Sequence, residues 1–486
     1  MGSANHRSTS FAFIGILTAL LFLNWLVAIA RFQPNVLFMD QWDFLVQVFY
    51  GGGWWDRFVH QHGPVREGLG LVISGWILEA TDWDVRFDSV FGATSLLLST
   101  LLALRLKWKM TGSVEVRDAW IPLLFLSLAH YETVLSVPQA AHSAVPLALT
   151  LLAANIWLGA RPPVRYVGCS VLAAILTFTG FGLFASAVIG ALLTMHAVRL
   201  ASERDYPGMT FATVGLAVVI ASWVRFSQGY MFQPAVDGFR FPWTPWTDYL
   251  RFIVVMLTLP LSGMGTGPRA YVCGTILALL VLAATSRIAS TWSVRRLSLQ
   301  ADVLVLLMGS ALIFTAATAV GRVPLGIAAA TAPRYLSLML PAWLAVYLTA
   351  LSSRRVGIGI VASACVWLLA VWPYAWMRDR PLADWPGTFG VTNAHVDTIR
   401  MHGLDKAEWA RVYLETGSVD TAQAAVQVPV YPNPPATHLD KKLGLLRGRG
   451  LSFFAGQPQR RDYLPWLADA TQVNPRCSGS SHRGCD

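Results

Sequence analysis

Residues 36–70, directly after a long apolar segment, contain Asp40, Asp43, Asp56, His60, His62, Arg66 and Glu67. Asp40 and Asp43 are three positions apart, so a helix through "DQWDF" would place both carboxylates on one face. Two close carboxylates push their pKa values apart, and one of them can then accept a proton as a general base. Such a pair also binds a divalent cation. The structural alternative is that Asp40 is only the N-cap of a short amphipathic helix.

The histidines and the arginine of this stretch have both functional and structural interpretations. His60 and His62 alternate, so a strand would place both on one side, where they could ligate a metal or hydrogen-bond a substrate. Two polar loop histidines at a membrane interface are the simpler interpretation. Arg66 is suited to holding a phosphate or to pairing with one of the two aspartates. Glu67 precedes an apolar helix, where its charge would favour the helix dipole.

Later in the chain, polar residues at the edges of apolar segments complete the candidate site. Arg334 begins an apolar segment beside Tyr335, and Arg322 lies in the connection before it. A guanidinium binds phosphate in a bidentate manner, although an arginine that extends its head to the interface is the structural alternative. Glu132 and Gln139 lie between two apolar segments and could orient a sugar. An ionisable group at that depth is costly unless it has a partner or reaches water.

These residues must be positioned by membrane helices. The chain has 486 residues, of which 55% are hydrophobic and 13% are charged, whereas soluble domains carry about 25% charged residues. Spans need about 20 apolar residues. The eleven candidates are 11–30, 88–106, 119–137, 143–160, 164–180, 182–198, 209–225, 270–287, 303–321, 335–351 and 356–374. The sequence therefore predicts an all-α polytopic membrane protein.

Charge distribution orients these spans. The net charge is +10, but the basic residues form short clusters between apolar segments, which is typical of topology signals rather than of nucleic-acid binding. With the N-terminus in the cytoplasm, every inner connection is basic, and the first outer loop, 31–87, has more carboxylates than arginines. This orientation requires 68–81 to be an interfacial helix and 249–263 to be re-entrant or interfacial. Gly180 and Gly182 would permit a tight reversal between two short spans, or one bent helix.

The composition changes after Trp372. Residues 375–486 carry many charged residues and proline clusters, which predicts a small extracytoplasmic C-terminal domain after a membrane domain of residues 1–374. "DKAEWARVYLETG", 405–417, is typical of a short helix. Cys477 and Cys485 either form a disulfide, which suits an oxidising compartment, or are two free thiols.

Three motifs resemble the GT-C superfamily, the integral-membrane glycosyltransferases that use polyprenyl-phosphate-linked sugars. They are "MDQWDF" at 39–44, "HQHGPVREGLGLVISGWIL" at 60–78, and "APRYLSLMLPAWLAVYL" at 332–348. A weaker similarity is "HYETVLSVPQAAHS" at 130–143. The resemblance covers roughly the first 370 residues and is of the bacterial type.

The resemblance implies a fold and a reaction. A GT-C protein would transfer a sugar from a polyprenyl-phosphate donor to a cell-envelope glycan or lipid acceptor on the outer face of the cytoplasmic membrane. Asp40 would be the general base, and a single displacement would invert the anomeric carbon. No Gly-rich phosphate-binding loop follows a strand, which is consistent with a lipid-phosphate donor. A divalent cation is the one cofactor that the acidic pair suggests.

Other functions remain open from the sequence. A transporter or flippase of a lipid-linked substrate is the main alternative, but transporters place charged or helix-breaking residues inside paired spans. Here the spans are nearly free of charge and the acids cluster in the first loop. A glycan polymerase or ligase would carry an arginine-rich loop late in the chain. A membrane scaffold would leave Asp40, Asp43 and Arg334 without a role.

Overall fold

The computed structural model is almost entirely helical. It describes residues 2–136, 138–232, 239–262, 264–292, 298–352, 356–381, 389–431 and 438–455. The strands of the described part form two antiparallel pairs, β1 (Gln61–His62) with β2 (Val65–Arg66) and β3 (Met377–Pro381) with β4 (Phe389–Asn393). The predicted all-α class is confirmed.

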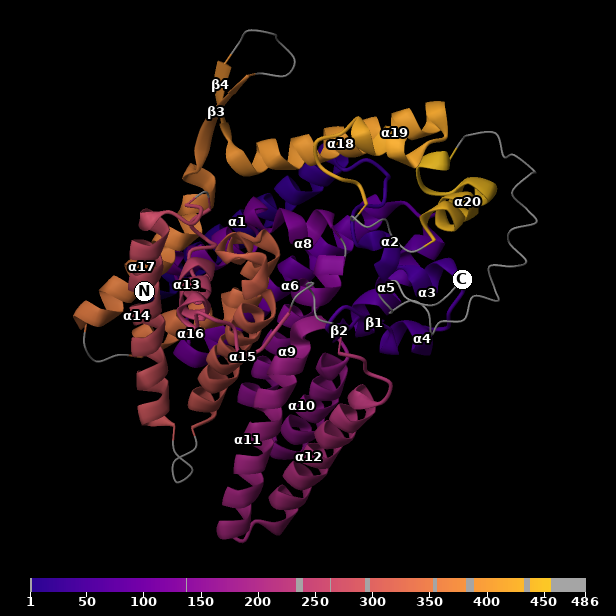
Figure 1. The fold of residues 1–486 in the computed structure, drawn as a ribbon. Helices are drawn as coiled ribbons and strands as arrows, with labels where there is room; N and C mark the ends of the chain where they lie inside the picture. Colours follow the sequence, from indigo (N-terminus) through magenta and orange to yellow (C-terminus); the bar gives the residue numbers. More distant parts are fainter. Residues whose placement is uncertain are drawn as a thin grey trace.

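Eight helical segments of the described chain are long and apolar enough to cross a membrane. They contain α1 (Gly2–Phe32), α6 (Val85–Thr111), α9 (Val145–Gly159), α11 (Leu183–Ser202), α12 (Tyr206–Ser227), α14 (Pro268–Thr291), α15 (Leu299–Arg322) and α16 (Leu336–Leu351). Shorter apolar helices are α5 (Gly68–Ala80), α10 (Pro162–Thr177) and α17 (Val356–Ala375). The chain is therefore a multi-pass membrane protein (Figure 1).

The predicted span 119–137 is not a continuous helix. It consists of η1 (Val116–Ala119), α7 (Trp120–Phe125), η2 (Leu128–His130) and α8 (Tyr131–Leu135). The Ser127 hydroxyl accepts a hydrogen bond from the Ala129 N–H, which competes with the helical pattern. The Trp25 indole of α1 donates to the Leu126 carbonyl at 3.0 Å. Broken backbone at membrane depth is tolerated where the protein buries it, and Leu126 is 1% exposed.

Two other segments are short helices, as expected. α5 covers 68–80, and α13 (Thr247–Met256) is followed by turns rather than by more helix. Ten helical residues reach about 15 Å, half of a typical hydrocarbon core. The reversal at Gly180 is also confirmed: this residue has a φ of +52°, and α10 and α11 are separate helices that pack together.

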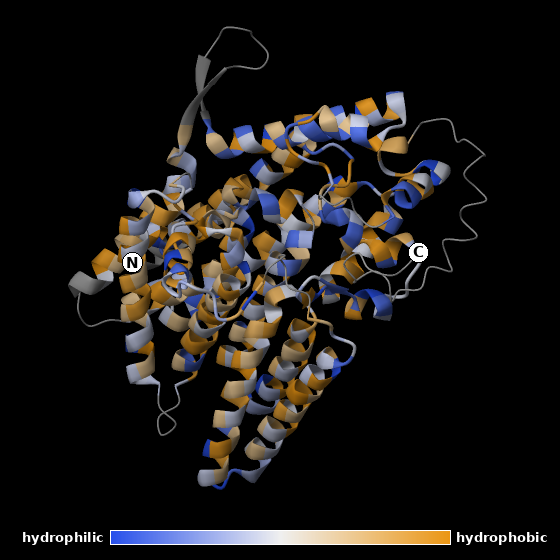
Figure 2. Ribbon diagram, in the orientation of Figure 1, coloured by the Kyte–Doolittle hydropathy of each residue, from blue (hydrophilic) through white to orange (hydrophobic). Residues whose placement is uncertain are grey.

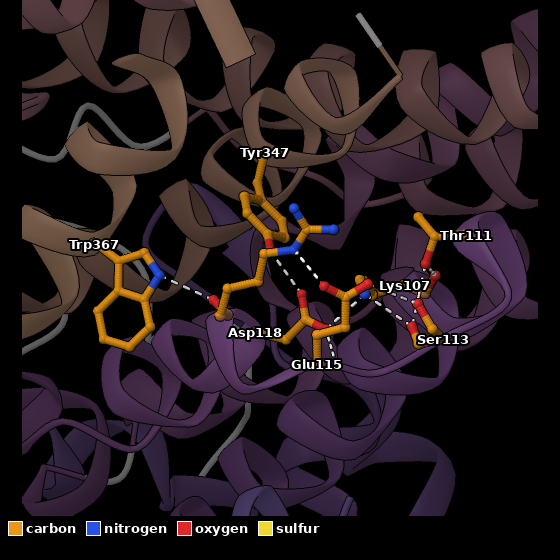
Figure 3. Close-up of polar contacts among 8 residues, drawn as sticks. Lys107, Thr111, Ser113, Glu115, Asp118, Tyr347 and Trp367 are labelled. Carbon is orange, nitrogen blue, oxygen red and sulfur yellow. Dashed lines mark hydrogen bonds and ion pairs between the residues drawn. The ribbon is translucent and has the colours of Figure 1, made fainter. Parts of the chain in front are cut away.

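At the end of α6 remote from the first loop, a buried ion pair joins three helical segments. Lys107 Nζ lies 2.6 Å from Asp118 Oδ2, and both side chains are fully buried (Figure 3). The Tyr347 hydroxyl of α16 donates to Asp118 Oδ1 at 2.7 Å. Lys107 also donates to the Ser113 carbonyl at 2.8 Å. Lys107, one of the basic residues in the predicted inner connections, therefore has a structural partner inside the protein.

The first loop and the C-terminal helices share one hydrophobic core. The loop supplies α2 (Gln41–Phe44) and α3 (Val46–Phe49), while α4 (Trp54–Val59) lies outside this core. The part of the chain after α17, which we call the tail, supplies α18 (Ala394–Thr416), α19 (Val419–Ala424), α20 (Leu439–Arg449) and η9 (Ser452–Phe454). Trp42, which is fully buried, lies 6.5 Å from Trp409 of α18 between ring centroids. Cys477 and Cys485 lie outside the described residues.

We call the end of the molecule where the first loop meets the C-terminal helices the α18 end. α18 lies across the ends of the membrane helices, and the connection between α11 and α12 lies at the opposite end (Figure 1). Hydrophilic residues are frequent on α18 and α20, whereas hydrophobic residues dominate α9 to α12 and α14 to α16 (Figure 2). The predicted helix at 405–417 is part of α18, which has 23 residues.

Candidate functional site

Asp40 lies at the α18 end, at the start of the first short helix after α1. It occupies the N-cap position of α2, yet its side chain accepts no hydrogen bond from that helix. The half-buried carboxylate makes no hydrogen bond or ion pair with the residues that the structure describes. Its charge acts on Glu67, His142 and Arg334. Asp40 is therefore an unpaired carboxylate whose charge acts on an acid, an imidazole and a guanidinium.

Glu67 and His142 form a buried pair next to Asp40. His142 Nε2 lies 2.8 Å from Glu67 Oε1, and the Glu67 side chain is fully buried. Glu67 Oε2 has no hydrogen-bond partner among the described residues. Burial raises the pKa of Glu67 well above its usual value; His62 lowers this pKa and the Asp40 charge raises it further. Glu67 therefore retains a proton more readily than an exposed glutamate does.

Close packing of α5 against the turn before α9 brings this pair together. His142 lies in the π-helical turn η3 (Ala140–Ala144), directly before α9. Such turns are rare and often occur at functional sites. A Cβ on Gly70 of α5 would lie 2.3 Å from the Ala141 Cβ, so only glycine permits this approach.

The two predicted histidines have different neighbours. His60 is buried, and its Nδ1 lies 3.5 Å from Gln47 Nε2. Burial above all, and then nearby positive charge, lowers the pKa of His60 to about 3, so this histidine is neutral near pH 7. The His62 ring stacks on the His142 ring at a centroid distance of 6.2 Å. His62, rather than His60, therefore adjoins the Glu67–His142 pair.

Arg66 is bound to backbone carbonyls. Its Nη2 donates to Phe226 at 2.9 Å and to Gln228 at 2.8 Å, and its Nη1 donates to Val59. These contacts connect the first loop to the C-terminal end of α12. Arg66 makes no ion pair with Asp40 or Asp43 in the described structure. Its donors are already used, so its position favours a structural role.

Asp43 has a basic partner from the tail. Its Oδ1 lies 2.8 Å from the Lys442 Nζ of α20, and the Lys442 side chain is only 1% exposed. Asp40, at the N-terminus of the same short helix, does not share this contact. The expected pair of cooperating carboxylates is therefore divided between two environments.

Arg334 and Glu132 are brought together by η8 (Pro333–Tyr335) and α8. Arg334 Nη1 lies 3.6 Å from Glu132 Oε2, and the Arg334 backbone N–H donates to the same oxygen at 3.3 Å. The Arg334 guanidinium lies 5.4 Å from the ring centroid of Tyr335, which is buried. Because the Asp40 charge also acts on Arg334, the predicted base and the predicted phosphate ligand belong to one electrostatic environment.

Arg322 and Gln139 are the remaining predicted site residues. Arg322 ends α15, is half-buried, and makes no ion pair or hydrogen bond with the described residues. Its charge acts on His142, as do those of Asp40 and Arg334. Gln139 is buried at the N-cap position of η3. The charges of one unpaired acid and two guanidinium groups thus act on His142.

A cavity of about 450 Å³ lies beside Glu132. Its walls come from α8, from α13 and the turns after it, from the connection before η8, and from Trp376 and α18. Ser262, Met264 and Gly265, at the end of the segment 249–263 and directly after it, also line the cavity.

Sequence reasoning missed the Glu67–His142 pair. Glu67 was interpreted as a favourable charge near a helix N-terminus, and His142 lay in the quoted segment 130–143 without being selected. The available signal was an ionisable residue at the start of an apolar span, which requires a partner. Periodicity gives no means of finding that partner 75 residues away.

No group of three or more histidine, cysteine, aspartate or glutamate side chains in the described chain is arranged to hold a metal ion. The divalent cation therefore stays a prediction from the sequence.

Neither protein-family models nor curated proteins match this sequence. Function is therefore inferred from the geometry of the site.

Proposed function

We propose that this protein is a membrane glycosyltransferase of the GT-C kind. It moves one sugar from a polyprenyl-phosphate donor to a hydroxyl group of a cell-envelope glycan or lipid, on the outer face of the cytoplasmic membrane. The observation that carries the proposal is the unpaired Asp40 carboxylate at one end of a membrane-helix bundle, whose charge acts on the Arg334 guanidinium.

In the proposed reaction each charged side chain has a separate role. Asp40 takes the proton of the acceptor hydroxyl as its oxygen attacks the anomeric carbon. The bond from that carbon to the phosphate oxygen breaks, and the lipid phosphate leaves with the electron pair. Arg334 and Arg322 stabilise the departing anion, because a guanidinium is suited to a phosphate. A single displacement inverts the anomeric centre.

His142 and its neighbours orient the sugar in this scheme. The Glu67 carboxyl fixes one ring nitrogen of His142, which leaves the other for a sugar hydroxyl. His62 stacks on the same ring and forms part of the wall. Asp43, His60 and Arg66 support the first loop rather than the substrate, since each has a partner within the protein.

The α18 end faces the outside in this proposal. The basic connections between predicted spans then lie in the cytoplasm, in agreement with the positive-inside rule. A polyprenyl phosphate places its charged head at the membrane surface, close to where the first loop begins.

The test uses purified protein and a panel of polyprenyl-phosphate sugars, with release of free sugar or of lipid phosphate as the readout. Wild-type protein should hydrolyse or transfer at least one donor. Asp40→Asn should lower turnover about 10²-fold or more, because it removes the general base. The matched control is Asp82→Asn, an exposed residue of the same loop with a φ of +51°, which asparagine tolerates.

Two results would contradict the proposal. Equal turnover by wild type and Asp40→Asn would remove the base from the mechanism. Transport of an intact labelled lipid-linked sugar across vesicle membranes, without any cleavage, would favour the transporter.

A further inference from the structure

The cavity beside Glu132 is not used by the proposed chemistry, and its lining shows what it can bind. Glu132 is the only acidic residue among the described residues that line the cavity, and no lysine or arginine is among them. Arg322 and Arg334 do not line it. A phosphate in this cavity would meet a carboxylate and no guanidinium, so the lining disfavours an anion.

Glu132 presents an uncommitted acceptor at the cavity. Its Oε2 receives the Arg334 N–H and lies near the guanidinium. Its Oε1 accepts no hydrogen bond from the residues that the structure describes. A carboxylate oxygen of this kind binds hydroxyl groups well, because hydrogen bonds to a charged acceptor are about twice as strong as neutral ones.

The other walls suit a ring that has polar edges and apolar faces. Tyr131 and Trp376 contribute aromatic surfaces on the side of α18. Hydroxyl groups come from Thr258, Ser262 and Thr398, while α13 and Leu336 supply apolar surface. The volume of about 450 Å³ lies within the usual range for small-molecule sites.

We propose that this cavity binds the acceptor, and that the group it holds is an uncharged sugar ring. The inference rests on the proposed glycosyl transfer and adds a division of the site: the donor phosphate lies with Arg334 and Arg322, and the acceptor sugar lies in the cavity that Glu132 lines. The Glu132–Arg334 contact then lies between the two substrates, and Asp40 stays the base that takes the acceptor proton.

The test measures binding of a panel of methyl glycosides, both pyranosides and furanosides, to the full-length protein in lipid nanodiscs by saturation-transfer NMR and titration. At least one should bind, with a dissociation constant on the order of 1 mM. Glu132→Gln should weaken it about tenfold, because a charge-assisted hydrogen bond becomes a neutral one. Ala328→Trp, at an exposed lining residue, should abolish binding by filling the cavity.

Glu203→Gln is the control, since Glu203 forms an exposed pair with Arg199 in α11 and the following turn, away from the cavity. Absence of binding by every glycoside, unchanged binding in Ala328→Trp, or displacement of the glycoside by excess inorganic phosphate would overturn the inference. The Asp40→Asn turnover assay tests the chemistry separately, so loss of the cavity proposal and loss of the glycosyltransferase proposal are distinguishable.

Discussion

At the scale of residues, two aspartates three positions apart have opposite surroundings. Asp43 lies against a buried lysine, whereas Asp40 has no partner in the described structure. An unpaired carboxylate near guanidinium groups is available for proton transfer, while a paired one stabilises the fold. Substitution of each should therefore affect a different property.

Asp43→Asn should lower stability rather than turnover. The change leaves the Lys442 ammonium, which is 1% exposed, without its counter-charge. Removing one member of a fully buried pair costs about 3–5 kcal/mol, and because the Asp43 side chain is 30% exposed we expect about 2 kcal/mol. Thermal unfolding in detergent measures the loss, and turnover per folded molecule should stay near that of the wild type.

Lys442→Met, combined with Asp43→Asn, tests whether the unpaired lysine causes the loss of stability. In the double variant Asp43→Asn with Lys442→Met, part of the lost stability should return, because no buried charge is left unpaired. Turnover that falls as far in Asp43→Asn as in Asp40→Asn would assign Asp43 to the chemistry instead.

At the scale of elements, the crossing of α18 over the end of α1 depends on a glycine. A Cβ on Gly403 would lie 2.1 Å from the Phe32 carbonyl oxygen, which is backbone and cannot move aside. The two helices therefore meet at closer range than any other residue permits, and this contact sets the position of the tail above the first loop.

Gly403→Ala should destabilise the protein by about 1–2 kcal/mol, because overpacking outweighs the gain in helix propensity. The sign is informative, since alanine in an open helical position stabilises by up to about 1 kcal/mol. Gly15→Ala in α1 is the matched control, because nothing lies within 4 Å of the added Cβ. A higher unfolding temperature for Gly403→Ala than for the wild type would show that α18 does not pack on α1 in this way.

The sequence predicts the elements better than it predicts their partners. Long apolar runs and short apolar helices follow from length and composition, so the long spans, α5 and α13 were foreseen. The break within 119–137 was not, because it depends on the Trp25 indole of another helix. For the same reason Arg322, Arg334 and Asp40 could be proposed individually, while the Glu67–His142 pair that joins them could not.

At the scale of the whole molecule, the tail is attached to the membrane bundle through a buried lysine. Lys406 of α18 donates to Gln33 Oε1 at 2.8 Å, beyond the end of α1, and is 1% exposed. Burial lowers the pKa of Lys406 to about 7, against about 10.4 in an unfolded chain. Between these values the unfolded state binds more protons than the folded state, so stability rises with pH.

The apparent unfolding temperature should therefore increase from pH 7 to pH 9, with a slope of at most about 1.4 kcal/mol per pH unit from this group. Lys406→Met should reduce that slope, and Lys441→Met, in α20, should not. Scans at one fixed heating rate make the comparison, because unfolding of a large membrane protein is under kinetic control. A pH dependence identical in wild type and Lys406→Met would contradict a neutral, buried amine.

The core shared by the first loop and the tail also has a consequence for synthesis. The Met39 N–H, next to Asp40, donates to the Val430 carbonyl at 2.6 Å, and Phe454 is fully buried in the same core as Trp42. Pairings so distant along the chain form late. A ribosome must therefore translate past Val430 before the backbone next to Asp40 acquires this partner, and past Phe454 before the shared core is complete.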